Sequence, residues 1–520
     1  MPASPVAAGR PRLTLLSVCG ATFMLLVDVT IVQVALPTMQ RHLHAGFGDL
    51  QWVIDAYAVV LAALILTSGT LADRFGRKRV FVAGVAVFTV ASLLCGLSTG
   101  AAMIIWFRAL QGVGGAAMFA TGLALIGQDF HGPARARAIA LWGATVGGAV
   151  AVGPLIGGAL TGGLGWRWIF FVNVPVGIAT VLLSGRSMRN VSDPGSRTLD
   201  VPGVVLFSGA LFLLIFGLIR GNAAGWSSPM IIGVLAGAAL LLSAFVVVEL
   251  RQERPMFDLS LLRRPSFTGV SVGTFALGAG MFGLFPFFTL YLQNDLGYSP
   301  FQGGLRLLPS TVLSFAVPLL LRNHLDRAAP GVLLGGGLAL TAAGVALLLL
   351  VGPASGWTAM LPGLVVTGVG VGVSNPAIAR TGLGVVPPER TGMASGLSNT
   401  FRMGGLATGV AAWGALFQNQ VQSSLQGRLH RPEADLARKV AAAGLHHGTP
   451  ALLDAVSHAF ASGMDLLALV AAVLVGAGAV VAAVTIRNRD FHPLPSSVLA
   501  GAASSAPSAA EVGAQALLGG

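Results

Sequence analysis

Residues 69–79 read Gly-Thr-Leu-Ala-Asp-Arg-Phe-Gly-Arg-Lys-Arg, four cations and one acid between two long apolar runs. The runs, 50–68 before the segment and 80–107 after it, are each long enough to cross a lipid bilayer as a helix. The short basic segment must therefore reverse the chain at a membrane surface. Because cytoplasmic loops carry an excess of Lys and Arg, its four cations predict that this surface is the cytoplasmic one.

The composition of the whole chain agrees with a lipid environment. Of its 520 residues, 54% are hydrophobic and only 10% are charged, which is too little charge to coat a water-soluble surface of this size. Most of the 71 glycines fall inside the apolar runs, where they permit close helix contact. Cys19 and Cys95 lie within predicted spans and are expected to act as small apolar residues rather than as a disulfide or a metal site.

Fourteen segments have the length and hydrophobicity of transmembrane helices. They cover residues 12–37, 50–72, 80–99, 101–127, 138–161, 167–185, 201–219, 229–249, 267–292, 304–321, 331–352, 357–379, 392–417 and 465–486. Both termini then face the cytoplasm, and most of the 31 Lys and Arg residues lie on that side. Topology therefore accounts for the net charge of +12, and nucleic-acid binding is not expected.

Two polar linkers, 186–200 and 250–266, bracket two apolar spans and divide the chain. The predicted parts are a cytoplasmic N-terminus at 1–11, a six-helix bundle at 12–185, a linker region with two extra helices at 186–266, a second six-helix bundle at 267–486 with an external loop at 418–464, and a disordered cytoplasmic tail at 487–520. The Ala, Leu and Arg content of the external loop favours short amphipathic helices on the outer surface.

The 69–79 segment resembles, position by position, the loop between the second and third helices of the major facilitator superfamily, where Gly-x-Leu-x-Asp-Arg-x-Gly-Arg-Lys/Arg recurs. The resemblance implies an all-α integral membrane protein with the major facilitator fold, two six-helix bundles to which this chain adds two inserted helices. Leu-Ala-Asp-Arg at 71–74 is echoed by His-Leu-Asp-Arg at 324–327, as two related halves would require. By resemblance, Asp73 pairs across the cytoplasmic face when the carrier opens outward. The loop residues expected to act in gating are Gly69, Asp73, Arg74, Gly76 and Arg77.

Four ionisable side chains lie inside predicted helices, namely Asp28, Asp55, Arg108 and Arg402. Each requires a reason, because a central Asp or Arg costs about 2.5–3.5 kcal/mol on insertion scales. An acid that faces a cavity with an arginine can gain and lose a proton, so Asp28 with Arg108 is the predicted proton-coupling pair. The alternative is a fixed Asp28–Arg108 ion pair that holds the bundle together, and the two interpretations do not exclude each other.

The sequence around these charges resembles that of drug:proton antiporters with fourteen transmembrane helices. Residues 28–37 match their first-helix string, with Gln33 where those proteins usually carry Asn. Asp55 resembles the branch that exports quaternary ammonium compounds, and a second membrane carboxylate could attract a lipophilic cation or hold another proton. Since Asp55 is near a predicted helix start, an acid on the outer surface is an equal alternative. Residues 108–112 are similar to the superfamily's Arg-x-x-Gln-Gly segment, which implicates Arg108 in proton transfer. The substrate cavity is expected to include Asp28, Gln33, Asp55, Tyr57 and Gln111.

Residues 149–158 resemble the Gly-x-x-x-Gly-Pro-x-x-Gly-Gly signature of antiporters, with Ala149 in place of the first Gly. Symporters and uniporters generally lack this pattern. Pro154 removes a helix hydrogen bond and the glycines admit another backbone closely, which favours a bend between the two bundles. The residues expected to act in conformational change here are Gly153, Pro154, Gly157 and Gly158. Residues 165–175 resemble another string of these exporters and predict an anchor at the outer interface.

The second bundle offers aromatic residues with little fixed polarity. Most of the phenylalanines that crowd residues 267–292 are expected to pack or to face lipid. The residues expected to line the substrate cavity from this half are Phe285, Phe288, Asn375, Asn399 and Arg402. No acid accompanies Arg402 within 392–417, so its part in coupling stays open.

Several classes of function are excluded. The two lysines, Lys78 and Lys439, are followed by Arg and Val, so the chain has no Walker A lysine for ATP-driven transport. With no metal cluster or hydrolytic triad, neither an enzyme nor a cofactor is expected. We predict a monomeric, proton-driven antiporter of a bacterial cytoplasmic membrane that exports amphipathic, cationic drugs or antibiotics, with lipid, substrate and protons as its partners. The alternatives are a narrow exporter of an endogenous metabolite and a non-transporting membrane sensor or assembly partner.

Overall fold

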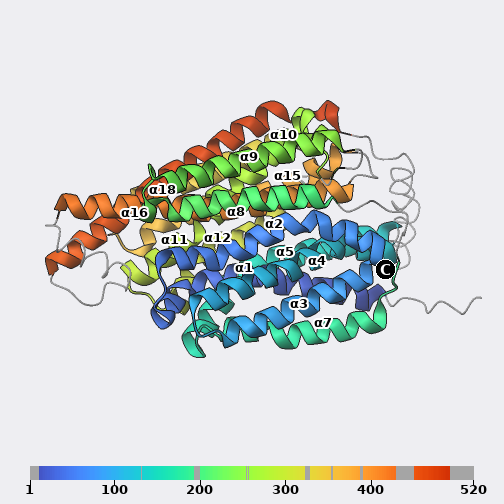
Figure 1. Ribbon diagram of the computed structural model, residues 1–520, viewed down its shortest axis with the longest axis horizontal. Helices are drawn as coiled ribbons and strands as arrows, with labels where there is room; N and C mark the ends of the chain where they lie inside the picture. The colour runs from blue at the N-terminus through green and yellow to red at the C-terminus, as the bar shows by residue number, and fades with distance from the viewer. Residues whose placement is uncertain are drawn as a thin grey trace, which may run out of the picture.

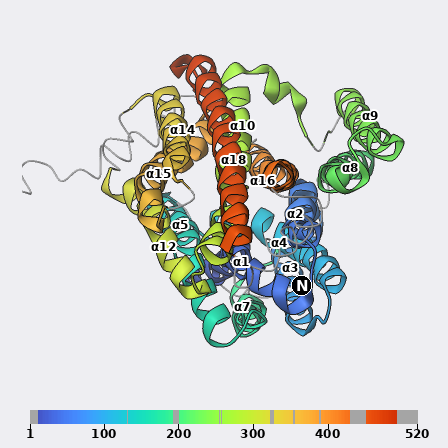
Figure 2. The ribbon, with the colours of Figure 1, turned by 90° about the vertical axis from the view of Figure 1, so that its left-hand side faces the viewer.

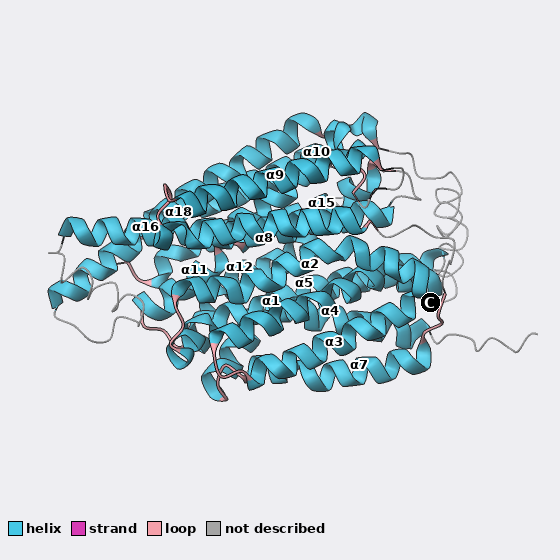
Figure 3. Ribbon diagram, viewed as in Figure 1, coloured by secondary structure: helices cyan, strands magenta, loops and turns pink. Residues whose placement is uncertain are grey.

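The computed structural model describes residues 11–130, 132–191, 200–252, 255, 257–321, 328–352, 355–386, 391–428 and 450–491. All regular secondary structure among these residues is helical, and the long helices run side by side along the longest axis of the molecule (Figures 1 and 3). The predicted all-α fold is confirmed.

The helices fall into three successive groups along the chain. The first group is α1 (Pro11–Leu43), α2 (Phe47–Phe75), α3 (Arg77–Leu97), α4 (Ala101–Asp129), α5 (Gly132–Gly163), the short α6 (Trp168–Phe171) and α7 (Asn173–Ser187). A hairpin follows, made of α8 (Val201–Ala224) and α9 (Pro229–Arg251). The last group is η1 (Leu259–Arg263), α10 (Pro265–Leu277), η2 (Gly278–Phe282), α11 (Phe285–Leu290), η3 (Tyr291–Asp295), α12 (Pro300–Leu320), α14 (Pro330–Leu347), η4 (Leu348–Leu350), η5 (Trp357–Met360), α15 (Leu361–Gly384), α16 (Thr391–Arg428), α18 (Pro450–Thr485) and η7 (Asn488–Asp490).

Twelve helical stretches of the described chain are long and apolar enough to cross a membrane. The other two predicted ranges are occupied by α5 and α16, helices of 32 and 38 residues. The total of fourteen spans stays a prediction. The chain is a multi-pass, all-helical membrane protein.

The first group packs as one bundle, called here the first bundle, and the helices from α10 to α18 pack as the second bundle (Figure 2). Close approach of backbones organises the first bundle around α4. A Cβ atom on Gly114 would lie 2.5 Å from the Phe88 nitrogen of α3, and one on Gly112 would lie 2.7 Å from the Tyr57 carbonyl oxygen of α2. Glycine is therefore required where α4 meets both neighbours.

The two bundles meet mainly where α2 contacts α16, where α5 contacts α12, and where α1 contacts α11 and α12. The 69–79 loop, the end of α7 and the starts of α8 and α10 lie at one end of the molecule, called here the linker end, and the α1–α2 turn lies at the opposite end (Figure 1). Several of the contacts between bundles lie toward the opposite end. Gln51 Nε2 donates to the Val410 carbonyl oxygen at 3.0 Å, and Gln293 Nε2 donates to the Val34 carbonyl oxygen at 2.8 Å.

Some helices extend beyond their predicted boundaries. The first helix does not end at Pro37 but continues through it to Leu43. The predicted external loop 418–464 is helical on both sides, because α16 runs to Arg428 and α18 begins at Pro450, so that both project beyond the other helices (Figure 1). The helical hairpin has its own contacts, since Gln420 Nε2 donates to Ser462 Oγ at 2.8 Å and the Phe417 and Phe460 rings lie 4.8 Å apart.

The first residues of the predicted disordered tail are ordered. Residues 487–491 are ordered against the second bundle, where Ser266 Oγ donates to Asp490 Oδ2 at 2.6 Å and accepts from the Arg487 nitrogen at 2.9 Å. The rest of the tail, the N-terminal residues 1–10 and the 324–327 echo lie outside the described residues.

Candidate functional site

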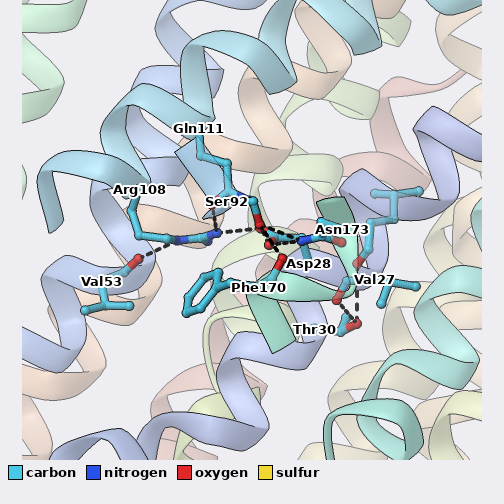
Figure 4. A network of polar contacts seen from close by, with 10 residues as sticks. Val27, Asp28, Thr30, Val53, Ser92, Arg108, Gln111, Phe170 and Asn173 are labelled. Atoms are coloured by element: carbon cyan, nitrogen blue, oxygen red, sulfur yellow. Dashed lines mark hydrogen bonds and ion pairs between the residues drawn. The ribbon is translucent and has the colours of Figure 1, made fainter. Parts of the chain in front are cut away.

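The centre of the first bundle holds a buried polar network around Asp28 (Figure 4). Asp28 lies midway along α1 and is 0% exposed. Its Oδ2 accepts a hydrogen bond from Arg108 Nη1 of α4, which is also an ion pair. Its Oδ1 accepts from Gln111 Nε2 at 2.9 Å and from Asn173 Nδ2 at 3.1 Å. One cation and two amides from α4 and α7 therefore surround a carboxylate that no water reaches.

Arg108 is held from several sides. Its guanidinium is 1% exposed and stacks over the Tyr57 ring at 4.3 Å. Its Nε donates to the Val53 carbonyl oxygen at 3.1 Å, and its Nη1 also donates to Gln111 Oε1 at 2.8 Å. The predicted pairing of Asp28 with Arg108 is thus present, and Gln111 and Tyr57 belong to the same network.

Asn173 and Ser92 belong to the network and were missed by the sequence analysis. Asn173 is the first residue of α7, and its Nδ2 donates to Ser92 Oγ at 3.0 Å as well as to Asp28. Ser92 Oγ in turn donates to the Phe170 carbonyl oxygen of α6 at 2.9 Å. The only sign of Asn173 in the sequence is one amide within the apolar segment 165–175. That segment as a whole is predicted to anchor the protein at the outer interface.

Asp55 is a second buried acid with a different environment. It is 0% exposed, so the alternative of an acid on the outer surface is wrong, because α2 already begins at Phe47. Neither carboxylate oxygen has a hydrogen-bond partner, and the Tyr57 hydroxyl has none either. One turn before Asp55, Gln51 binds the α16 backbone, so this face of α2 lies on the seam between the bundles. Gln33 is buried on α1 and makes no hydrogen bond to the Asp28 network.

The predicted residues of the second bundle are not gathered around Asp28. Phe285 and Phe288 are buried in the core of the second bundle. Asn375, on α15, is half-buried and its side-chain oxygen has no partner, and Arg402, on α16, is half-buried with an unpartnered Nε. Asn399 also lies half-buried on α16, one turn before Arg402.

One aromatic residue outside the predicted set does reach both bundles. Phe282, at the end of η2, packs against the hydrophobic cores of the first and the second bundle. It therefore lies between the two bundles.

The 69–79 loop is held by the segment that follows α7. Gly76 has φ +103°, and a Cβ atom there would lie 2.2 Å from Asn190 Oδ1, so only glycine fits. The Arg77 nitrogen donates to the Val191 carbonyl oxygen at 3.3 Å, and Arg77 Nη2 donates to Asp73 Oδ1 at 3.0 Å. In this structure Asp73 is paired within its own loop, and its pairing across the face stays a prediction for another conformation.

The start of the same loop is open. A Cβ atom on Gly69 would meet no atom within 4 Å, and Arg74 is exposed. Among the described residues, no group of three or more His, Cys, Asp or Glu is placed to hold a metal ion.

The glycines of α5 lie between α1 and α12. A Cβ atom on Gly153 would lie 1.8 Å from Thr30 Oγ1, and one on Gly158 would lie 2.6 Å from the Pro300 carbonyl oxygen. Gly157 faces Ile31, and Pro154 lies inside the helix with its carbonyl against Gly304 of α12. The segment therefore contacts its own bundle on one side and the second bundle on the other.

The sequence profile of the Major Facilitator Superfamily matches residues 18–410. The chain belongs to the major facilitator superfamily. A relative, the "Tetracenomycin C resistance and export protein" of Streptomyces glaucescens, is 35% identical over 513 residues, 93% of each chain. The "Multidrug resistance protein Stp" of Mycobacterium tuberculosis is 34% identical over 424 residues, 81% of this chain and 79% of that one.

A solved structure of the same superfamily fold supports the assignment. The inward-facing, occupied form of a bacterial homologue of the human lysosomal transporter Spinster matches with a TM-score of 0.66. It covers 95% of this chain and 100% of that one at 16% identity, a likeness of fold. This member of the major facilitator superfamily is thus a membrane transporter of the drug-export type and not an enzyme.

Proposed function

We propose that this chain is a proton-coupled antiporter that exports amphipathic, cationic drugs or antibiotics, with Asp28 as its coupling acid. The observation that carries the proposal is the complete burial of the Asp28 carboxylate beside the Arg108 guanidinium. A buried charge pair is costly unless both partners remain engaged, so a group that changes charge there changes the energy of the whole site.

The network supplies a means of coupling. Protonation of Asp28 removes the charge that Arg108 faces, while the guanidinium keeps the Val53 carbonyl, the Gln111 amide and the Tyr57 ring as partners. Arg108 itself does not deprotonate in proteins, so the mobile proton belongs to the acid. An ion pair that forms and breaks with each proton can bias an equilibrium between two arrangements of the bundles.

Asp55 is the candidate for the second polar group of the cavity. A buried carboxyl with no partner on either oxygen is ready to receive a donor or a cation, which supports a role in holding a second proton or a cationic substrate. An Asp55→Asn variant is expected to lose transport of cationic compounds more than of neutral ones. Equal losses would contradict a charge-specific role.

The movement in this proposal is a rocking of the two bundles about a site near the membrane midplane. Gly153, Pro154, Gly157 and Gly158 provide the close α5–α12 contact, and the loop around Asp73 acts as a gate. The carrier works as a monomer in a bacterial cytoplasmic membrane with both termini in the cytoplasm, driven by the proton gradient without ATP or another cofactor.

A second candidate substrate class follows from one relative. The name of the Streptomyces glaucescens protein couples resistance to export of one compound, which favours a narrow exporter of a metabolite made by the same cell. The name of the Mycobacterium tuberculosis protein favours the broader multidrug activity.

Purified protein in vesicles with an imposed pH gradient tests both. Ethidium fluorescence and lumenal pH are followed together for wild type, Asp28→Asn and the control Asp454→Asn, whose side chain is 70% exposed. Proton-linked ethidium movement in wild type and control, but not in Asp28→Asn, is the expected result. Equal export by Asp28→Asn would remove Asp28 from the mechanism, and movement of tetracenomycin C without ethidium would favour the narrow exporter.

A further inference from the structure

The groups that bind the Asp28 carboxylate all donate hydrogen bonds to it (Figure 4). Arg108 Nη1 donates to Oδ2, and the Gln111 and Asn173 side-chain amides donate to Oδ1. A charged carboxylate only accepts hydrogen bonds, so this arrangement fits the charged form of Asp28. A protonated carboxyl also has an O–H donor, which needs an acceptor when it is buried. When Asp28 takes up a proton, one of its partners must therefore turn an acceptor toward it.

Two of the three partners cannot supply that acceptor. A guanidinium has donors only, which excludes Arg108. The other oxygen-bearing partner on α4, Gln111, already accepts from Arg108 Nη1 through its Oε1 at 2.8 Å. Turning the Gln111 amide would place its N–H donors against those of the guanidinium, with no acceptor between them. Both residues therefore keep their present orientation when Asp28 becomes neutral.

Asn173 is the partner that can change. Its Nδ2 donates to Asp28 Oδ1 at 3.1 Å and to Ser92 Oγ at 3.0 Å. A half-turn of the amide exchanges Nδ2 with Oδ1, so that the oxygen takes the place between these two atoms. There it accepts from the new O–H of Asp28. The Ser92 hydroxyl, which now donates to the Phe170 carbonyl oxygen at 2.9 Å, can rotate and donate to the turned amide instead.

The packing of α7 holds this amide within reach of both partners. Asn173 is the first residue of α7 and is 3% exposed, and Ser92 of α3 is 0% exposed. One turn after Asn173, a Cβ atom on Gly177 would lie 1.9 Å from Thr89 Oγ1 of α3. The two helices thus approach as closely as glycine permits, and a turn of the amide exchanges hydrogen bonds without moving either helix.

Few titratable groups other than Arg108 lie around Asp28. Tyr57 of α2 and Cys95 of α3 are within electrostatic range of it. The Tyr57 hydroxyl has no hydrogen-bond partner, so it does not supply the acceptor in place of Asn173. α6 and α11 contain no titratable residue. Those of α5, α7 and α12 are arginines toward the helix ends, namely Arg135, Arg137, Arg186 and Arg306.

We propose that Asn173 is a positioning residue for proton coupling, whose side-chain amide turns over when Asp28 is protonated and passes the change through Ser92 to α6. The proton stays on Asp28, and only hydrogen bonds are exchanged. In the protonated state the bond from Ser92 to the Phe170 carbonyl is lost, so the contact between α3 and α6 is weakened. The inference rests on the proposed function, in which Asp28 is the coupling acid.

The test is acid-induced infrared difference spectroscopy of the full-length protein in lipid nanodiscs. Cell-free synthesis supplies asparagine with heavy carbon at its side-chain carbonyl, so a band that moves with the label belongs to an asparagine. The labelled band that is missing from Asn173→Leu belongs to Asn173. The protonated-carboxyl band that is missing from Asp28→Asn reports the proton on Asp28. The control is Asn222→Leu, which removes an amide that binds the Ala415 carbonyl oxygen and Trp226 Nε1 instead of an acid.

The Asn173 band is expected to shift at the pH at which the Asp28 carboxyl band appears. This shift should be lost in Asp28→Asn and persist in Asn222→Leu. In Ser92→Ala it should be smaller, because the turned oxygen keeps one donor instead of two. If Asn173→Leu does not fold, Asp28→Asn and Ser92→Ala still decide, because no other described asparagine is hydrogen-bonded to Asp28 or Ser92.

Two results would overturn the inference while the proposed function stands. The first is an Asp28 carboxyl band that appears while the Asn173 band does not move. The second is a shift that is unchanged in Ser92→Ala, which would remove the path to α6. Absence of any Asp28 carboxyl band would overturn the proposed function and this inference together.

Discussion

Neutralising both members of the Asp28–Arg108 pair should destabilise the protein about as much as neutralising either one alone, and far less than the sum of the two single changes. Asp28→Asn leaves a guanidinium that is 1% exposed without a counter-charge, and Arg108→Gln leaves a fully buried carboxylate with only the Gln111 and Asn173 amides. Removal of one partner of a buried pair costs about 3–5 kcal/mol. The remaining neutral contacts place each single variant near the lower end, at about 3 kcal/mol.

The double variant Asp28→Asn/Arg108→Gln removes both charges and should cost about 3 kcal/mol rather than the sum of about 6 kcal/mol, so the coupling energy is about 2–3 kcal/mol. Equilibrium unfolding in mixed micelles with increasing dodecyl sulfate, followed by circular dichroism, measures all four corners of the cycle.

The matched control is the cycle between Asp73 and Arg77, a pair at 3.0 Å whose side chains are 47% and 34% exposed. Water screens such a pair, so its coupling should stay below about 1 kcal/mol. If the buried pair couples no more strongly than the exposed one, the claim that Asp28 and Arg108 form one energetic unit is refuted.

Three further outcomes are expected. Asn173→Leu removes donors at 3.1 Å from Asp28 and 3.0 Å from Ser92 and should cost about 1.5–3 kcal/mol in the same unfolding assay, whereas unchanged stability would exclude a supporting role. Gly114→Ala places a carbon 2.5 Å from a backbone nitrogen of α3 and should cost about 1–3 kcal/mol, while Gly143→Ala, with no atom within 4 Å, should stay within about 0.5 kcal/mol. Asp73→Asn should change stability by less than about 1 kcal/mol and keep substrate binding but slow turnover in vesicles, and a total loss of affinity in folded protein would contradict its gating role.

Much of the fold could be predicted because lipid imposes strict rules on length and charge. A bilayer requires about 20 apolar residues for each crossing, so the apolar runs predict the helices, and the basic loops predict which side faces the cytoplasm. The same cost of charge in lipid singled out Asp28 and Arg108, and the structure brings these two together from α1 and α4.

The parts that could not be predicted depend on contacts rather than on composition. Asn173 is one amide in an apolar string, and only the packing of α7 on α1 and α3 shows that it reaches Asp28. The burial of Asp55 depends on where α2 begins. The helix begins at Phe47, before the predicted start at residue 50. Helix in the external loop was predicted from its composition, but the continuation of α16 and α18 into it depends on pairings between them, such as that of Phe417 with Phe460.

The α8–α9 hairpin has a consequence for how a compound dissolved in the membrane could approach the transporter. α8 binds both bundles, because its Asn222 Nδ2 donates to the Ala415 carbonyl oxygen of α16 at 2.5 Å and its Phe212 ring lies 5.5 Å from the Trp52 ring of α2. It thus covers the α2–α16 seam from the side (Figure 2). No described helix outside the two bundles packs in the same way across α5 and α12. Lipid tails and lipophilic solutes therefore meet the α2–α16 seam only behind α8, whereas the α5–α12 seam has no such cover. A compound that enters from within the membrane is expected to approach from the α5–α12 side.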